Sequence, residues 1–171
     1  MFHLFPAWNG SHPVVVHFPI ILLMIAPLLV IAGAALPIAK RGPFLAAALI
    51  LMVVGTSTTY LAVATGESAR QTLGSGPAFS GLVEEHRSLA ETTREVFSVL
   101  TLVFAFLLFA HKLMRRQLDS WVRTSLLAAF LLFYGTGAVL LIDTALKGTS
   151  LVRVLGARRA VTSNLPSEGE P

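Results

Sequence analysis

Four long apolar segments constrain this chain more than any other feature of its sequence. They define predicted helices at about 13–39, 43–65, 83–114 and 121–146, the third becoming apolar only after Glu95. At 1.5 Å rise per residue, about 20 apolar residues cross the hydrocarbon of a bilayer. Backbone groups inside a bilayer must be satisfied within the protein, which favours helices. The sequence therefore predicts an all-α integral membrane four-helix bundle.

The composition agrees with a membrane protein. It is 54% hydrophobic and 13% charged, whereas soluble domains carry roughly 25% charged residues. No Lys or Arg precedes Lys40, so the first segment lacks the basic region of a signal peptide and is expected to be retained. The chain has no Cys, which excludes thiolate-bound metal sites and thiol nucleophiles. Its positive charge lies in short loops beside apolar runs, so we expect no nucleic-acid partner.

The predicted domain organisation has three parts. Residues 1–12 are rich in aromatic side chains, which suits a segment at the membrane interface. Residues 13–147 form the four-helix domain, and residues 148–171 form a polar C-terminal tail whose end is expected to be disordered. We find no internal repeat in the sequence.

Charge asymmetry predicts the orientation. Four crossings place both termini on one side of the membrane. The two short connections on the other side hold one acid, Asp119, and six basic residues: Lys40, Arg41, Lys112, Arg115, Arg116 and Arg123. Such a bias marks the cytoplasmic side. We therefore expect both termini on the periplasmic side of a bacterial inner membrane.

This topology gathers ionisable residues from four separate segments at the end of the bundle that carries the termini, here called the polar pole. They are His12, His17, Glu67, Glu84, Glu85, His86, Glu91, Arg94, Asp143 and Lys147. A histidine inside a membrane segment is energetically costly, so its presence there suggests a functional role. Without Cys, any ligand set must consist of His and carboxylate.

One histidine from each of two helices can hold a planar haem between them. His17 and His86 are the predicted axial ligands, with His12 as a supporting residue or an alternative ligand. Arg94 is the predicted propionate partner, because a guanidinium binds carboxylate bidentately. His12 lies about 140° from His17 around an ideal helix, so the two do not form a chelate. His111 lies about 37 Å from His86 by helical rise, without a second histidine nearby, which favours one site.

Several simpler interpretations stay open. His12 and His17 could bond carbonyls freed by Pro19, and His3 and His111 could be interfacial residues. A copper or zinc ion could instead be held by His12, His17, His86 and Glu67, or the chain could be a scaffold without a cofactor. No nucleophile–base pair or phosphate-binding loop is present in the sequence, so a stand-alone enzyme is not expected.

Short motifs at the segment ends resemble a known family. They are His12-Pro13-Val14-Val15-Val16-His17-Phe18-Pro19-Ile20, Ala64-Thr65-Gly66, Glu85-His86 and Gly148-Thr149-Ser150-Leu151-Val152. They are similar to the bacterial membrane proteins of DUF2231, a domain of unknown function. The resemblance implies a four-helix inner-membrane domain, often encoded or fused near cytochromes and metal-handling proteins. Arg153 and Leu155 stand where the family usually has Tyr and His, which argues against a second cofactor.

Together these observations predict a b-type haem-binding membrane subunit that handles electrons near the periplasmic face. We expect it to be part of a larger respiratory or photosynthetic complex. Its partners would be the lipid bilayer and other membrane subunits, such as a cytochrome.

Overall fold

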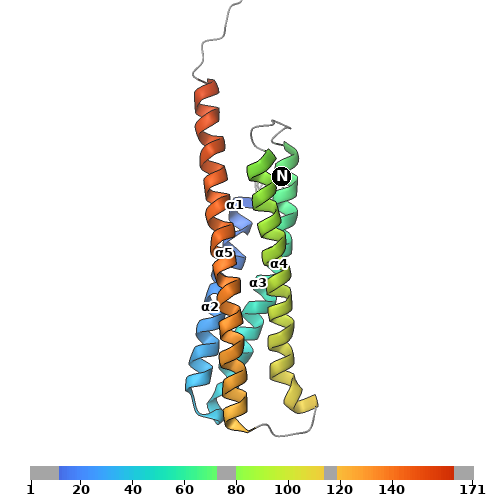
Figure 1. The fold of residues 1–171 in the computed structure, drawn as a ribbon, viewed down its shortest axis with the longest axis vertical. Helices are drawn as coiled ribbons and strands as arrows, with labels where there is room; N and C mark the ends of the chain where they lie inside the picture. The colour runs from blue at the N-terminus through green and yellow to red at the C-terminus, as the bar shows by residue number, and fades with distance from the viewer. Residues whose placement is uncertain (1–11, 73–79, 114–118, 164–171) are drawn as a thin grey trace, which may run out of the picture.

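The computed structural model describes residues 12–72, 80–113 and 119–163, and in these ranges it contains helices without strands. The helices are α1 (His12–Val15), α2 (His17–Ala35), α3 (Ile38–Thr72), α4 (Ser80–Leu113) and α5 (Ser120–Ser163) (Figure 1). Four spans, of which the first combines α1 and α2, are long and apolar enough to cross a membrane. The predicted all-α membrane bundle is confirmed.

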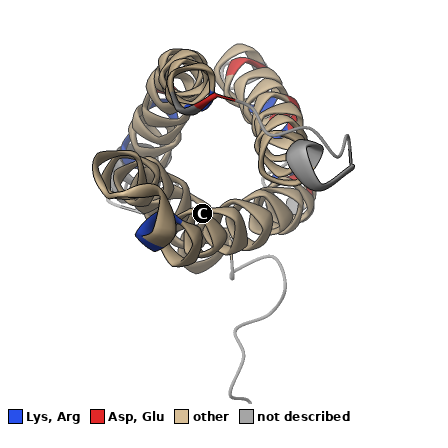
Figure 2. Ribbon diagram, turned by 90° about the horizontal axis from the view of Figure 1, so that it is seen from below, with Lys and Arg blue, Asp and Glu red and all other residues tan. Residues whose placement is uncertain are grey.

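The helices surround one axis in the order in which they occur in the chain. α2 packs on α3, α3 on α4, α4 on α5, and α5 closes the ring against α2; Figure 2 shows this arrangement along the axis. α1 to α3 form a first hairpin, and α4 with α5 forms a second. The site described below lies between these two hairpins.

Large apolar side chains cover the outside of the bundle as well as its core. Leu28, Ile50, Leu102 and Leu132 are 60–77% exposed in the isolated chain. A helix that is apolar all round is buried in a large core or in a membrane. The outer face of this bundle is therefore the surface that contacts lipid.

Prolines determine the shape of the first span. Pro19 has no N–H to offer the carbonyl of Val15 four residues earlier, and the helix is interrupted at Val16. Pro27 likewise leaves the carbonyl of Leu23 without its helical partner. The buried Tyr134 hydroxyl of α5 donates to that carbonyl over 2.6 Å. α5 thus supplies the hydrogen bond that Pro27 removes from α2.

The core between the helices is aromatic. The rings of Phe104 and Phe130 stack with centroids 4.9 Å apart, and Phe130 lies 5.8 Å from Tyr134. Tyr134 meets Phe97 edge to face at 5.4 Å. These contacts join α4 to α5 below the polar pole.

Two helices extend well beyond the predicted apolar spans. α3 continues through Gly66 to Thr72, and α5 continues through Gly148 to Ser163. Residues 148–163 are thus helical, where a polar tail was expected, while residues 1–11 and 164–171 lie outside the described part. The connection between α2 and α3 is also shorter than expected, since α3 begins at Ile38. Apolar patterning locates the part of a helix inside the hydrocarbon, and a polar extension carries no such signal.

Candidate cofactor site at the polar pole

His12 is held in a defined orientation by Thr65 of α3. Its Nδ1 lies 3.0 Å from the Thr65 hydroxyl oxygen. That hydroxyl has one hydrogen, and two carbonyl oxygens of its own helix can accept it. They belong to Leu61 and Ala62 and lie at 2.9 and 3.0 Å. With that hydrogen on either carbonyl, the Thr65 oxygen accepts from His12 Nδ1–H, and we assign this tautomer to His12. In neutral His12 this tautomer leaves Nε2 unprotonated and able to bind a metal.

His86 of α4 is half-buried and incompletely satisfied. Its ring packs on Gly148 of α5 and interacts with the backbone of Thr144. Its Nδ1 is buried without a hydrogen-bond partner within the described part of the chain. A buried polar atom without a partner costs about 1–3 kcal/mol. This nitrogen marks a position where a ligand would remove an energetic cost.

The structure brings His12 and His86 together from different hairpins. The two imidazoles lie close enough to influence each other electrostatically. His17 is placed differently: its side chain is exposed, and its Nδ1 lies 2.6 Å from the Pro13 carbonyl of the preceding turn. His12 therefore takes the place beside His86 that was expected for His17. A ligand role for His17 stays a prediction.

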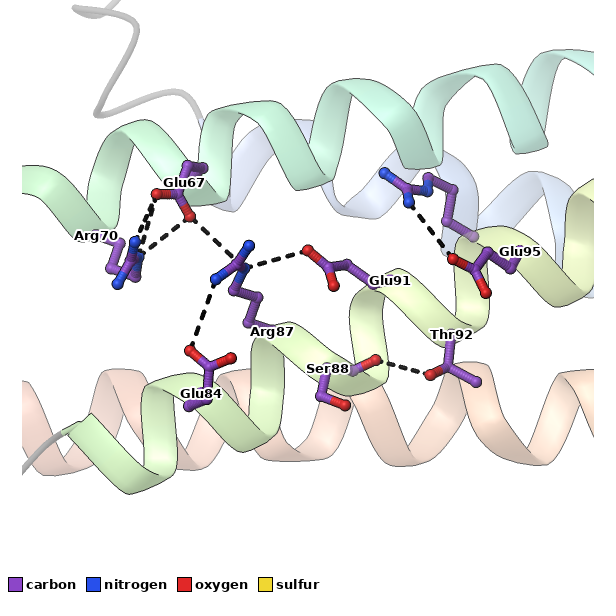
Figure 3. Close-up of polar contacts among 9 residues, drawn as sticks. Glu67, Arg70, Glu84, Arg87, Ser88, Glu91, Thr92 and Glu95 are labelled. Atoms are coloured by element: carbon purple, nitrogen blue, oxygen red, sulfur yellow. Dashed lines mark hydrogen bonds and ion pairs between the residues drawn. The ribbon is translucent and has the colours of Figure 1, made fainter.

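An ion-pair network crosses the polar pole between α3 and α4 (Figure 3). Arg87 lies 3.8 Å from Glu67, 3.7 Å from Glu84 and 3.1 Å from Glu91. Glu67 also binds Arg70 at 2.7 Å. Glu67 thus pairs with two guanidinium groups, and its alternative role as a metal ligand stays a prediction. Among the described residues, no three His, Asp or Glu side chains gather as ligands of one metal ion.

Arg94 lies about 12 Å further along α4 than His86 by helical rise. Its guanidinium carbon sits 5.2 Å from the centre of the Tyr60 ring of α3, and its guanidinium lies 3.8 Å from the carboxylate of Glu95. A further link between helices is the ion pair of Lys147 with Glu85, which joins α5 to α4. The predicted propionate role of Arg94 stays a prediction.

Sequence reasoning overlooked three residues of this pole. Thr65 and Gly66 were interpreted as the end of a helix, and Gly148 as the start of the tail. Their roles depend on contacts between helices, because Thr65 orients His12 while each glycine accommodates a histidine ring. His3 lies outside the described part of the chain, and so does the side chain of His111.

The fold and the pole define a four-helix integral membrane protein with a histidine pair between two helical hairpins. The chain belongs to DUF2231, a family of predicted membrane proteins, whose family model matches residues 10–160. No curated protein and no solved structure matches the chain.

Proposed function

We propose that this chain is a b-type haem-binding membrane subunit that transfers electrons near the periplasmic face, in which His12 and His86 would hold the haem iron. The observation that carries the proposal is that both imidazoles are half-buried at the polar pole, on different hairpins, and near enough for His86 to influence His12 electrostatically. One has Nε2 free through its bond to Thr65, and the other has a buried nitrogen without a partner among the described residues.

The donor set fits a haem better than a bare divalent ion. Two neutral imidazoles suffice for a six-coordinate haem iron, whereas structural zinc sites take four protein ligands. When bound, the haem supplies reversible one-electron chemistry at its iron. Thr65 holds the His12 ring, and the Glu67–Arg87 ion pair ties α3 to α4 above it. Arg94 stays the proposed propionate partner, and in this role its guanidinium would have to leave the Tyr60 ring.

The proposed setting is a larger respiratory or photosynthetic complex in a bacterial inner membrane. The basic connections at the opposite end of the bundle support a periplasmic polar pole. The resemblance to a family found near cytochromes supports an electron-transfer partner, such as another membrane subunit.

The first test is a reduced-minus-oxidised visible spectrum of the detergent-purified, haem-supplemented protein. We expect Soret and α bands that are lost in His12→Ala and in His86→Ala. His17→Ala is the matched control, because it removes a histidine of the same segment whose side chain is exposed. Loss of the bands in His17→Ala with retention in His12→Ala would restore the pairing of His17 with His86.

A scaffold without a cofactor is the second candidate, and the His12–Thr65 hydrogen bond favours it because that bond needs no ligand. In this case His12→Gln and His86→Gln would preserve assembly, and no bands would form. Binding of copper or zinc without a Soret band would instead support the metal alternative.

A further inference from the structure

The two histidines make equivalent contacts in the two hairpins. A Cβ on Gly66 would lie 3.0 Å from Cε1 of His12, and a Cβ on Gly148 would lie 2.9 Å from Cε1 of His86. In each case a histidine at the start of one helix lies against a glycine near the end of the next span. Neither imidazole could keep its observed position beside a residue with a side chain.

The equivalence extends to the backbone around each glycine. The His12 ring interacts with the backbone of Ala62, four residues before its glycine. The His86 ring interacts with the backbone of Thr144, also four residues before its glycine. Both rings thus lie against the turn of helix that ends at their glycine.

A second pair of glycines repeats the pattern three turns deeper. Gly55 and Gly137 each stand 11 residues before the glycine that contacts a histidine, so they lie on the same helix face. A Cβ on Gly55 would lie 2.8 Å from Leu23, and one on Gly137 would lie 2.9 Å from Leu100. Each hairpin therefore places one histidine and two closely packed glycines at corresponding positions.

From this arrangement we propose that Gly66 and Gly148 are positioning residues, which make room for the two imidazoles to take the positions from which they would hold a planar macrocycle. The inference rests on the proposed function. A side chain at either glycine would displace its imidazole from this position, and both ring nitrogens with it. The nitrogens would then no longer stand where the two histidines could hold a planar ligand.

The contact geometry makes this effect specific to the ring. The atom nearest to each added methyl group would be Cε1, which joins the two ring nitrogens. The imidazole must then move as a whole, and both nitrogens move with it. Because Cε1 belongs to a rigid ring, rotation about χ1 or χ2 of the histidine relieves the clash only by moving the whole ring.

The test compares haem uptake by Gly66→Ala and Gly148→Ala with that of Gly135→Ala. Gly135 lies on α5, and nothing approaches its Cβ position within 4 Å. We expect haem affinity, measured by Soret titration, to fall about tenfold or more in the first two variants and to stay unchanged in the third. The ferric electron paramagnetic resonance spectrum of any residual haem should shift in both variants.

A haem-free measurement separates this inference from the proposed function. We expect Gly148→Ala to lower the unfolding midpoint in the wild-type background and to have no such effect when combined with His86→Ala. Equal effects in both backgrounds, or full haem uptake by both glycine variants, would overturn the inference while leaving haem binding intact. Absence of haem uptake by the wild-type protein would overturn the proposed function and this inference with it.

Discussion

The tautomer of His12 depends on one hydroxyl group. In this assignment the Thr65 hydroxyl donates to a backbone carbonyl of its own helix. Its oxygen can then only accept a hydrogen bond from the imidazole. Partners of this kind orient a ligating histidine and raise its basicity. His12 is therefore prepared for metal binding by a residue that never touches the metal.

This arrangement predicts the effect of Thr65→Val. Valine preserves the shape of the side chain but removes the acceptor, so His12 Nδ1–H loses its partner. Haem affinity should fall about 10- to 100-fold, measured by Soret titration of the purified protein. Thr65→Ser keeps the hydroxyl and should bind haem as the wild type does; equal affinity of the valine and serine variants would exclude the orienting role.

At the scale of helices, the packing of α5 on α2 rests on a proline defect. Pro27 deprives the Leu23 carbonyl of its helical donor, and Tyr134 replaces that donor from the neighbouring helix. Tyr134→Phe should therefore destabilise the bundle by about 1–3 kcal/mol, since the buried carbonyl is left unsatisfied. Equilibrium unfolding in detergent measures this change.

The matched experiment uses Pro27→Ala as the background. Alanine restores an N–H four residues after Leu23, so the carbonyl no longer needs Tyr134. The cost of Tyr134→Phe should then be smaller than in the wild-type background, as a double-mutant cycle would reveal. An undiminished cost would mean that the tyrosine stabilises the bundle through its ring contacts alone.

The same scale shows what the sequence could and could not predict. The apolar segments identify the four spans, because the bilayer imposes their length. Gly66 is different: a glycine in a polar stretch is typical of a helix end, yet α3 continues through it and the ring of His12 lies against it. The sequence also could not predict that His12, and not His17, lies near His86, because a separation of about 140° around the helix does not tell which of the two histidines faces the second hairpin.

For the molecule as a whole, one expectation to test is the orientation of the chain in the membrane. The chain has no Cys, so single cysteines can be introduced without background. Thr149→Cys lies near the polar pole and Asp119→Cys at the opposite end, and both positions are exposed. In intact cells, a membrane-impermeant maleimide should label Thr149→Cys and spare Asp119→Cys. The reverse labelling would place the polar pole in the cytoplasm.

α5 is longer than the hydrocarbon core of a bilayer is thick, so part of it extends outside the lipid. Its 44 residues extend about 66 Å, while the hydrocarbon core is about 30 Å thick. Figure 1 shows its end rising beyond α3 and α4 on the side of the polar pole. The end of α5 thus projects beyond the other helices on the side of the histidine pair. Any globular partner that approached this site would have to fit beside the projecting helix.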